Sequence, residues 1–536
     1  MESFARRFFG GQKFAMVGWT QELLPDSHRA VHSMPDDSGK ARLIRLVLWL
    51  LTPFFTGAVI MAQELVAFRL YAPYFGYSIY VWGSTISVVM AALAIGYAIG
   101  GWGADRSQTG LPLYITLLGS AFYQLGILFV VRLMLPVFAR MGDFTGTVLA
   151  SLVIFAPPMT AVATACPFII RLLAQSGHVG SVAGKVYALS TVGSIGGILA
   201  TSFWLIPLLG TQKTLAVICA LSAVIAVTGL ALRAPTALLL LAIIVGALKF
   251  VPPITWSRNT VWVQESPYNL VRVVRDGQRL ILKLNDERGI HTIRDQRTGW
   301  TGNYYDDFAL GPLLAPAQRL LVLGMAGGGS IASTRVTAPD IDIDAVEIDP
   351  RVVEAAARFF GMNPDDKLLH IQVADARPWL AQNKGEYDIV HVDLYQGGPY
   401  IPFYLVTVEF FRSVRAHMSE DGLLMMNLFD MGRDQELLLA AAATLKRVFP
   451  IVAVLPIGSG NRMLLAFSKE TPDASIRARL ESYRGNAFVM RLAASAAARI
   501  SVIEPAAGTI VFTDDFAPVE NMTRRMLNSA NSRRSR

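Results

Sequence analysis

Residues 319–330 read RLLVLGMAGGGS, an apolar run that ends in a turn containing four glycines. The run predicts a buried strand. Glycine lacks a side chain, so such a turn lets the backbone approach a ligand and leaves the first amides of the next helix free to bind it. Gly324, Ala326, Gly327 and Gly328 are therefore predicted cofactor contacts. A glycine turn by itself also suits ordinary strand-to-helix packing, so the interpretation needs support from neighbouring strands.

Four more apolar runs follow, and the stretches between them, such as 350–360 and 404–418, read as helices. Strands that alternate with helices predict a parallel sheet covered on both faces. We expect a Rossmann-like α/β domain of the class I methyltransferase type over residues 301–520. The four runs are DIDAVEI (342–348), HIQVAD (370–375), YDIVHVD (387–393) and GLLMMNL (422–428).

Three acids stand where successive strands of this sheet end. Glu347 follows Gly324 by 347 − 324 = 23 residues, the spacing at which an acid accepts hydrogen bonds from ribose hydroxyls. Asp375, with Ala376, suits an adenine amino group, and Asp393 ends the fourth strand. Ligands bind beyond the carboxyl ends of parallel strands, so we expect the three acids to share one crevice. The glycine-to-acid spacing also suits a dinucleotide and does not by itself choose the cofactor.

The segment VWVQESPYNLVRVVRDGQRLILKLN (261–285) alternates apolar and polar residues around Asp276-Gly277. An Asp-Gly pair between two such runs predicts a hairpin. Residues 255–300 are therefore expected to form a small antiparallel β-unit that precedes the main sheet.

Residues 256–470 resemble the spermidine synthase (polyamine aminopropyltransferase) family. The resemblance is carried by ESPYN (265–269), NYYDD (303–307), the glycine turn, VEIDP (346–350), Asp375 and YDIVHVD. The motifs GAVIMAQELVAFRLYAPYFGYS (57–78), GGWGADR (100–106) and TDDFAPVE (513–520) resemble the membrane-tethered, transporter-fused branch. The resemblance favours an adenosyl sulfonium, either decarboxylated S-adenosylmethionine or S-adenosylmethionine, over NAD.

The resemblance also implies roles for single residues. The glycine turn would bind the amino-acid-derived end of the cofactor, Glu347 its ribose and Asp375 its adenine. Asp393 matches the family's first active-site aspartate, where a carboxylate can accept the proton of an attacking amine. Tyr304 and Tyr395 are expected to assist it, and Tyr268, Asp306 and Gln396 are expected to contact the substrate.

Two positions depart from the family pattern. Gly327 replaces an aspartate of the glycine loop, and Gln396 replaces the second active-site aspartate, three residues after Asp393. Each lost carboxylate removes a charge-assisted hydrogen bond to an amino group, worth about 1.5–3 kcal/mol. Putrescine is therefore not assured as the acceptor.

The chain as a whole is too apolar for a wholly soluble protein. The mean hydropathy is +0.42, and 53% of the residues are hydrophobic but only 16% charged. About seven stretches over 43–254 approach the ~20 apolar residues that cross a hydrocarbon core. Polar residues 1–42 precede them and show no secretory signal. The stretches are 43–67, 78–103, 111–135, 146–172, 184–208, 212–232 and 235–252.

Membrane topology has two conflicting indications. Basic residues before the first stretch and after the second, fourth and sixth place the N-terminus in the cytoplasm. Seven crossings would then leave the C-terminal domain outside, away from the cytosolic cofactor, so we suspect the last stretch, which is short and ends at Pro252-Pro253. We expect an integral protein of the inner (cell) membrane with a cytoplasmic catalytic domain.

Small residues such as Gly96, Gly100, Gly193 and Gly197 predict close contacts between helices in lipid. Glu64, a carboxylate at membrane depth, is either functional or paired with Arg69.

Charge and cysteine content limit the partners. The formal charge is +8, and five arginines lie in the tail 521–536, which we expect to be solvated or in contact with anionic lipid. No nucleic-acid-binding module accompanies the charge. Cys166 and Cys219 lie in apolar stretches, and no metal-ligand spacing occurs. The expected partners are the lipid bilayer and a small amine or other small acceptor, and the family resemblance is compatible with a homo-oligomer.

Three functions therefore remain. The first is transfer of an aminopropyl group from decarboxylated S-adenosylmethionine to an amine. The second is methyl transfer from S-adenosylmethionine to a membrane-associated acceptor, favoured by the missing acid at Gly327. The third is a transporter or sensor with a degenerate cofactor domain, suggested by Glu64 and by Asp105-Arg106.

Overall fold

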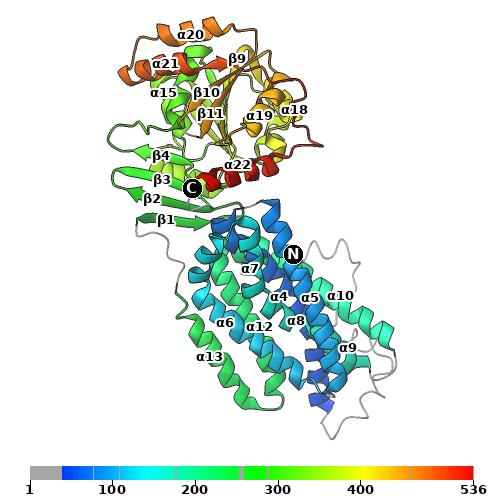
Figure 1. Cartoon of the computed structure of the whole chain (residues 1–536). Coiled ribbons are helices and arrows are strands. Elements are labelled where there is room, and N and C mark those ends of the chain that lie inside the picture. The colour runs from blue at the N-terminus through cyan, green and yellow to red at the C-terminus, as the bar shows by residue number, and fades with distance from the viewer. Residues whose placement is uncertain are drawn as a thin grey trace, which may run out of the picture.

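The chain folds into a helical bundle with an α/β domain stacked on one end of it (Figure 1). The structure is a computed structural model that describes residues 39–76, 78–107, 109–174, 178–252, 259–285, 289–458 and 460–534. Most of the polar segment expected over 1–42 and the boundary expected at 254 lie outside these residues.

The bundle contains six helical stretches that are long and apolar enough to cross a membrane. They are Leu43–Phe75, Ile79–Arg106, Leu111–Ala139, Ala156–Leu173, Val179–Leu209 and Thr211–Ala231. The seventh expected stretch forms only a shorter apolar helix, Pro235–Leu248. The elements are α4 (Gly39–Phe75), α5 (Ile79–Arg106), α6 (Leu111–Ala139), α7 (Asp143–Ile154), α8 (Ala156–Ala163), α9 (Ala165–Leu173), α10 (Val179–Ala200), the π-helical turn η2 (Thr201–Leu205), α11 (Ile206–Leu209), α12 (Thr211–Ala231), the 3₁₀ turn η3 (Pro235–Ala237) and α13 (Leu238–Leu248).

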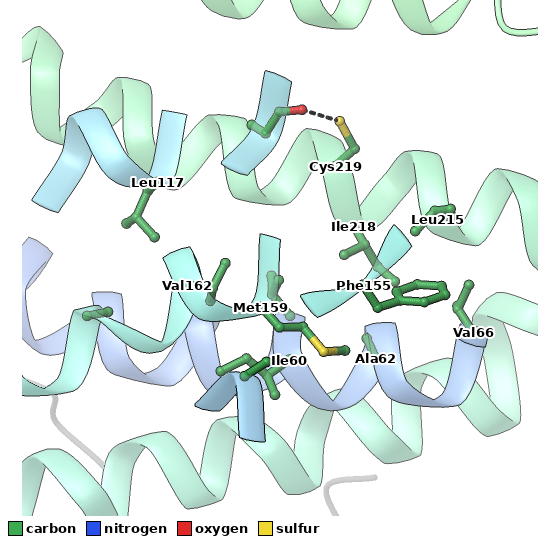
Figure 2. Packing of buried hydrophobic residues seen from close by; sticks show 14 of the residues in the cluster. Ile60, Ala62, Val66, Leu117, Phe155, Met159, Val162, Leu215, Ile218 and Cys219 are labelled. Atoms are coloured by element: carbon green, nitrogen blue, oxygen red, sulfur yellow. Dashed lines mark hydrogen bonds between the residues drawn. The ribbon is translucent and has the colours of Figure 1, made fainter. Parts of the chain in front are cut away.

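Prolines explain why the fourth stretch is divided into α7, α8 and α9. Pro157, Pro158 and Pro167 lie at or near the first turns of α8 and α9, where the missing N–H and the fixed φ angle of proline are tolerated. Met159 and Phe155 of this segment pack between α4 and α12, against Ala62 and Ile218 (Figure 2). The broken segment therefore lies inside the bundle.

The predicted close contacts between helices are confirmed at all four glycines. A β-carbon at Gly96 or Gly100 would collide with Thr160 or Thr164, and one at Gly193 or Gly197 would collide with the backbone of α4. The predicted ion pair of Glu64 does not form, because residues five apart point in different directions around a helix. Glu64 is buried, and its Oε2 has no hydrogen-bond partner among the described residues.

The β-unit is a four-stranded antiparallel sheet in the order β1-β2-β3-β4. Its strands are β1 (Thr260–Glu265), β2 (Leu270–Asp276), β3 (Arg279–Leu284) and β4 (Thr292–Asp295). Asp276 pairs with Arg279 across the predicted hairpin, and Gly277 has the positive φ of 58° that this tight turn requires.

The main sheet has eight strands in the order β12-β10-β11-β9-β8-β5-β6-β7. The five predicted strands form its parallel part, but β10, β11 and β12 join antiparallel, so the sheet is mixed rather than purely parallel. The strands are β5 (Arg319–Leu323), β6 (Asp342–Glu347), β7 (Leu369–Val373), β8 (Tyr387–Val392), β9 (Met418–Phe429), β10 (Ile451–Ile457), β11 (Asn461–Phe467) and β12 (Ser501–Val502).

Helices cover both faces of this sheet and enclose two apolar cores. One face is covered by α17 (Ala376–Gln382), α18 (Val408–Arg415), α19 (Glu436–Lys446) and α22 (Val519–Arg534). The other is covered by η4 (Tyr304–Leu310), α14 (Gly311–Leu314), α15 (Gly329–Thr337), α20 (Asp473–Ser482) and α21 (Ala487–Arg499).

The C-terminal tail is not the solvated segment that its composition predicts. Residues 519–534 form α22, which lies between α19 and the bundle (Figure 1). Arg524 lies over the ring of Tyr80, and Arg525 pairs with Glu436. Arg524 and Arg525 contact protein groups because α22 is at the junction of the two parts of the molecule.

Candidate active site

The glycine turn forms a close junction between β5, β6 and β8. Gly324 has a φ of 84°, and a β-carbon there would collide with the carbonyl of Asp393. Gly328, with a φ of 78°, precedes the first residue of α15. Only glycine fits both positions without strain. The turn therefore joins the ends of three parallel strands, as the sequence predicts.

Glu347 lies directly against this turn. Its Oε2 accepts a hydrogen bond of 3.0 Å from the Ala326 N–H, and its Oε1 accepts one of 3.1 Å from the Asp349 N–H. Burial raises the pKa of Glu347 to about 7, although these two hydrogen bonds lower it. The structure thus joins the glycine turn and the predicted ribose-binding acid.

Asp349 connects the β-unit to β6. Its Oδ1 caps α16 (Pro350–Ala355) by accepting from the Arg351 N–H, and its Oδ2 accepts from Ser266 at 2.6 Å and Asn269 at 2.8 Å. Asn269 in turn accepts from Asn285. The ESPYN and VEIDP motifs therefore form one buried network that positions the acid-bearing strand.

Asp375 follows β7 and caps α17. Its Oδ1 accepts from the Arg377 N–H at 3.0 Å, and Tyr404 donates to its Oδ2 at 3.3 Å. Ala374 donates its N–H to the Glu347 carbonyl, so the two acids stand at neighbouring strand ends. Ala376 is buried at the first turn of α17. The adenine role of this pair stays a prediction, and the observed role of the Asp375 side chain is that of a helix cap.

Asp393 is held between two donors at the end of β8. Tyr304 donates to its Oδ2 at 2.8 Å, and Asn427 of β9 donates to its Oδ1 at 3.0 Å. Asn427 is itself oriented by Asn461 at 2.8 Å. Burial raises the pKa of Asp393 to about 6, while the two hydrogen bonds lower it. The carboxylate is therefore able to take up and release a proton close to neutral pH.

The other predicted side chains are placed differently. The hydroxyl of Tyr395 accepts from the Phe429 N–H at 2.8 Å and donates to the Asn427 carbonyl at 3.3 Å, so it supports β9 beside Asp393. Gln396 is exposed on the loop after β8, and Tyr268 is 43% exposed at the turn between β1 and β2. No substrate contact is assigned to either side chain.

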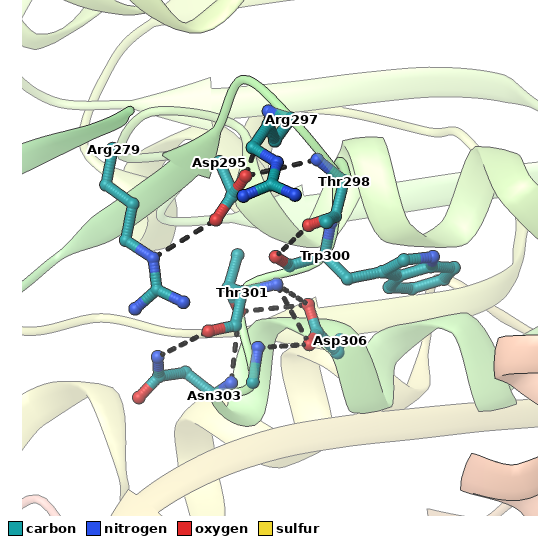
Figure 3. A network of polar contacts seen from close by, with 9 residues as sticks. Arg279, Asp295, Arg297, Thr298, Trp300, Thr301, Asn303 and Asp306 are labelled. Carbon is teal, nitrogen blue, oxygen red and sulfur yellow. Dashed lines mark hydrogen bonds and ion pairs between the residues drawn. The ribbon is translucent and has the colours of Figure 1, made fainter. Parts of the chain in front are cut away.

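Asp306 organises the turn that leads into η4 (Figure 3). Its carboxylate accepts from the N–H and hydroxyl of Thr301 and from the Gly302 N–H, at 2.7–3.1 Å. All these donors are local, so the carboxylate positions the loop before Tyr304. The predicted substrate contact of Asp306 remains untested.

The departure at Gly327 has a physical cause. Its N–H donates to the Thr292 hydroxyl at 2.9 Å, and a β-carbon at Gly327 would lie 2.8 Å from the β-carbon of Thr292. Real side chains essentially never approach so closely. The start of β4 therefore occupies the space into which an acid at position 327 would extend.

Sequence reasoning missed several groups around the site. Asn427 and Thr292 lie on strands whose motifs give no functional signal. The pairing of β9 with β8 brings Asn427 to Asp393, and the packing of the separate four-stranded sheet against the glycine turn brings Thr292 to Gly327. His291 and Asp307 are buried, and His291 Nε2 and Asp307 Oδ1 have no hydrogen-bond partner among the described residues. Burial lowers the pKa of His291 to about 4 and raises that of Asp307 to about 7.

The loop after β8 contacts both the β-unit and the bundle. A β-carbon at Gly397 would lie 2.9 Å from the β-carbon of Asn285, and one at Gly76 would lie 3.5 Å from the ring of Tyr400. Tyr400 accepts a backbone hydrogen bond from Gln396. The backbone of Gln396 is therefore linked, through Tyr400, to the turn between α4 and α5.

Comparison with known proteins finds relatives for the part of the chain that contains this site. The family model of the spermine/spermidine synthase domain matches residues 314–476. A probable polyamine aminopropyl transferase of Bifidobacterium longum is 30% identical over 301 residues, covering 52% of this chain and 66% of that protein. A polyamine aminopropyltransferase of Vibrio vulnificus is 32% identical over 163 residues, covering 29% of this chain and 52% of that protein.

A third relative belongs to another reaction class. The eEF1A lysine and N-terminal methyltransferase of Mus musculus is 32% identical over 162 residues, covering 28% of this chain and 23% of that protein. Each of the three matches spans less than two thirds of the relative's own length.

The fold and the family match define the C-terminal part as a spermidine synthase domain on a Rossmann-like sheet of the methyltransferase type. The relatives in Bifidobacterium longum and Vibrio vulnificus are both named as polyamine aminopropyltransferases.

Proposed function

We propose that this protein transfers an aminopropyl group from decarboxylated S-adenosylmethionine to an amine acceptor. The observation that carries the proposal is the partly buried Asp393, with Tyr304 and Asn427 as its donors, next to a glycine turn and Glu347. A carboxylate is the group needed to orient an ammonium and to accept its proton.

The reaction is a single displacement. The lone pair of the acceptor nitrogen attacks the propyl carbon attached to sulfur, the carbon–sulfur bond breaks, and its electron pair stays on sulfur. The sulfonium becomes the neutral thioether methylthioadenosine. The new secondary ammonium loses one proton, which Asp393 accepts and returns to water. Tyr304 orients the carboxylate, and Asn427 keeps its other oxygen in place.

The cofactor sites follow the same geometry. Gly324, Ala326 and Gly328 would border the cofactor's propyl end, Glu347 would accept from the ribose hydroxyls, and Asp375 with Ala376 would border the adenine. In the structure, Glu347 accepts from backbone N–H groups on both sides. A carboxylate has about four acceptor sites, so ribose hydroxyls can be added to these contacts.

We further propose that the helical bundle anchors the enzyme in a bilayer. Six stretches are long enough to cross it. Large apolar side chains also point outward from the bundle, where water would disfavour them and lipid would not. Side chains more than half exposed include Trp102, Leu133, Phe203, Trp204, Leu208 and Phe250.

Methyl transfer from S-adenosylmethionine is the second candidate. The packing of Thr292 against Gly327 favours it, because it removes the carboxylate that would bind the amino group of an aminopropyl chain. An aspartate at position 327 would repel the carboxylate of intact S-adenosylmethionine, and the glycine found there does not.

The test uses the full-length protein in detergent with labelled donor and a panel of di- and polyamines. We expect methylthioadenosine to form from decarboxylated S-adenosylmethionine, and Asp393→Asn to slow its formation by about 10²–10⁴-fold. Asp365→Asn, which changes an exposed carboxylate away from the site, is the matched control. S-adenosylhomocysteine from intact S-adenosylmethionine, without methylthioadenosine from the decarboxylated form, would replace the first function by the second.

A further inference from the structure

The bundle is crossed seven times in the part of the chain that the structure describes. Each passage runs between two ends of the bundle. Trp49, Gly110 and Leu172 lie together at one end, which we call the distal end, whereas Phe75, Phe138 and Gly146 lie together at the other, the proximal end. The passages are Gly39–Phe75, Ile79–Arg106, Leu111–Ala139, Asp143–Leu173, Val179–Leu209, Thr211–Ala231 and the stretch that begins at Pro235.

The last passage is complete, although its helix is short. It begins four residues after α12 ends and returns to the start of α12, where Gln212 Nε2 donates to the Pro252 carbonyl at 2.7 Å. The 14 residues from Pro235 to Leu248 span ~21 Å at 1.5 Å per residue. The four residues that follow add up to ~13 Å. Together they match the ~31 Å of the 21-residue α12.

The catalytic domain is attached only at the proximal end in the contacts between described residues. Glu265 accepts from the N–H and the hydroxyl of Thr211, at the first turn of α12. Glu520 accepts from the Ile79 N–H at 2.8 Å, at the first turn of α5. Since seven is odd, the N-terminal end of α4 and the catalytic domain lie at opposite ends of the bundle (Figure 1).

Basic residues are concentrated at the distal end. The distal end has more of them than the proximal end. At the distal end they are Lys40, Arg42, Arg45, Arg106, Arg171, Lys185 and Arg233. At or near the proximal end they are Arg69, Arg132, Arg140, Lys213 and Lys249. Within about 15–20 residues of the outermost passages, the sequence adds Arg29 to the first flank and Arg258 to the last. Lys and Arg mark the cytoplasmic side of a membrane protein, and the first helix usually dominates.

We infer that the distal end is cytoplasmic and that the catalytic domain lies on the opposite, non-cytoplasmic side of the membrane. This inference departs from the sequence-based expectation of a cytoplasmic domain. That expectation required the seventh stretch not to cross, whereas the Gln212–Pro252 contact brings this stretch back to the proximal end.

The inference limits where the substrates come from. Asp393 and the glycine turn then open to the non-cytoplasmic aqueous phase, so the amine acceptor is drawn from that compartment. A sulfonium donor made with cytoplasmic ATP has to be carried across the membrane first. The reaction class that precedes this enzyme is therefore a transport step for a cationic adenosyl compound.

The side of the domain can be tested by labelling single introduced cysteines. Both native cysteines are buried and therefore give little background. We would introduce Glu481→Cys on the exposed surface of the catalytic domain and Asp105→Cys at the distal end, where the side chain is 76% exposed. Asp105→Cys breaks only an exposed ion pair with Arg171, which contributes little to stability.

Spheroplasts expressing full-length variants are treated with a membrane-impermeant maleimide, with and without permeabilisation. The inference predicts that Glu481→Cys is labelled in intact spheroplasts and that Asp105→Cys is labelled at least tenfold more after permeabilisation. The reverse pattern, equal labelling of both sites, or protection of Glu481→Cys until permeabilisation would each overturn it. The assay reads no activity, so its outcome is independent of the methylthioadenosine assay.

A fusion at the C-terminus provides a second measurement in the same cells. Alkaline phosphatase fused after Arg536 should be active, and a green fluorescent protein fused there and exported unfolded should stay dark. A bright fluorescent fusion with inactive phosphatase would overturn the inference even if the cysteine variants were unstable.

Discussion

Asp393 illustrates how one residue depends on two distant elements. The donor on Oδ2 comes from Tyr304 at the start of the 3₁₀ helix η4, and the donor on Oδ1 comes from Asn427 near the end of β9. Because burial raises the pKa to about 6 against these two hydrogen bonds, the ionised form predominates only above that pH.

The first prediction concerns this carboxylate. Asp393→Asn should lower kcat by about 10²–10⁴-fold, the usual contribution of a general base. The affinity for the donor, measured by calorimetry, should stay unchanged, because the amide keeps the side chain's shape. In the unmodified enzyme, kcat/KM for the amine should fall below about pH 6 as Asp393 takes up a proton. Full activity of the Asn variant at pH 8 would remove Asp393 from the mechanism.

The second prediction concerns the space at Gly327. Gly327→Asp should reduce the free energy of unfolding by about 1–3 kcal/mol, because its β-carbon overlaps Thr292. Thr292→Gly removes the obstructing atoms, so the double variant should lose less stability than the sum of the two single variants. Denaturant unfolding in detergent measures all four proteins of this cycle. Strictly additive losses would show that Thr292 does not limit position 327.

At the scale of elements, the parallel part of the sheet was predictable because each strand is a short apolar run that ends in a glycine or an acid. The same rule predicts that Glu347, Asp375 and Asp393 stand at strand ends along one edge of the sheet. The rule does not extend to β10, because this strand is also followed by a glycine, Gly458, and yet pairs antiparallel with β11. The partners of the site were unpredictable as well, because Asn427 and Asn461 reach it through strand pairing and Thr292 reaches it through the packing of one sheet against the other.

For α22, the arginines of the tail 521–536 favoured a segment that is solvated or in contact with lipid, whereas Arg524 and Arg525 contact protein groups. Their partners, Tyr80 and Glu436, lie hundreds or scores of positions away in the chain, and a local pattern does not reveal such contacts.

The third prediction concerns η4, which presents Tyr304 to Asp393 and also carries the buried Asp307. Burial raises the pKa of Asp307 to about 7, well above its usual 3.8, so folding favours the protonated form. Its contribution to stability is therefore present at low pH and lost as the pH rises from about 4 to about 7. Asp307→Asn stays neutral and should retain more of its thermal stability at pH 8 relative to pH 5 than the unmodified protein.

Thermal unfolding of both proteins at the two pH values measures this difference. Asp365→Asn, an exposed change, should leave the pH dependence as it is. Asp307→Asn should still lose some thermal stability between pH 5 and pH 8, because burial also raises the pKa of Glu347 and Asp393. An identical pH dependence in Asp307→Asn and the unmodified protein would show that Asp307 does not titrate in this range.

At the scale of the whole molecule, two carboxylates of the catalytic domain accept hydrogen bonds from the first turns of two bundle helices. The N-terminal turn of a helix has unpaired N–H groups and a partial positive charge, so Glu265 at Thr211 and Glu520 at Ile79 both cap and neutralise it. Between these two contacts, the ring of Tyr400 lies beside Gly76, on the loop that also carries Gln396. The orientation of the domain on the bundle and the position of this loop are therefore linked.

The fourth prediction follows from these two caps. Glu265→Gln keeps an acceptor oxygen but loses the charge, and it should reduce the free energy of unfolding by about 0.3–1 kcal/mol. Glu265→Ala loses both the oxygen and the charge, and it should reduce the free energy of unfolding by about 0.5–2 kcal/mol. Hydrogen exchange in nanodiscs should show faster exchange at the Thr211 amide, with the larger increase in the Ala variant, and Glu520→Ala should do the same at Ile79.

If the caps hold the domain in place, the double variant Glu265→Ala/Glu520→Ala should also raise exchange across residues 396–400 and increase KM for the amine without changing donor affinity. Glu481→Ala, an exposed change far from the bundle, should alter none of these quantities. Faster exchange confined to the two helix ends would mean that the domain is held by other contacts and that the bundle does not position the loop.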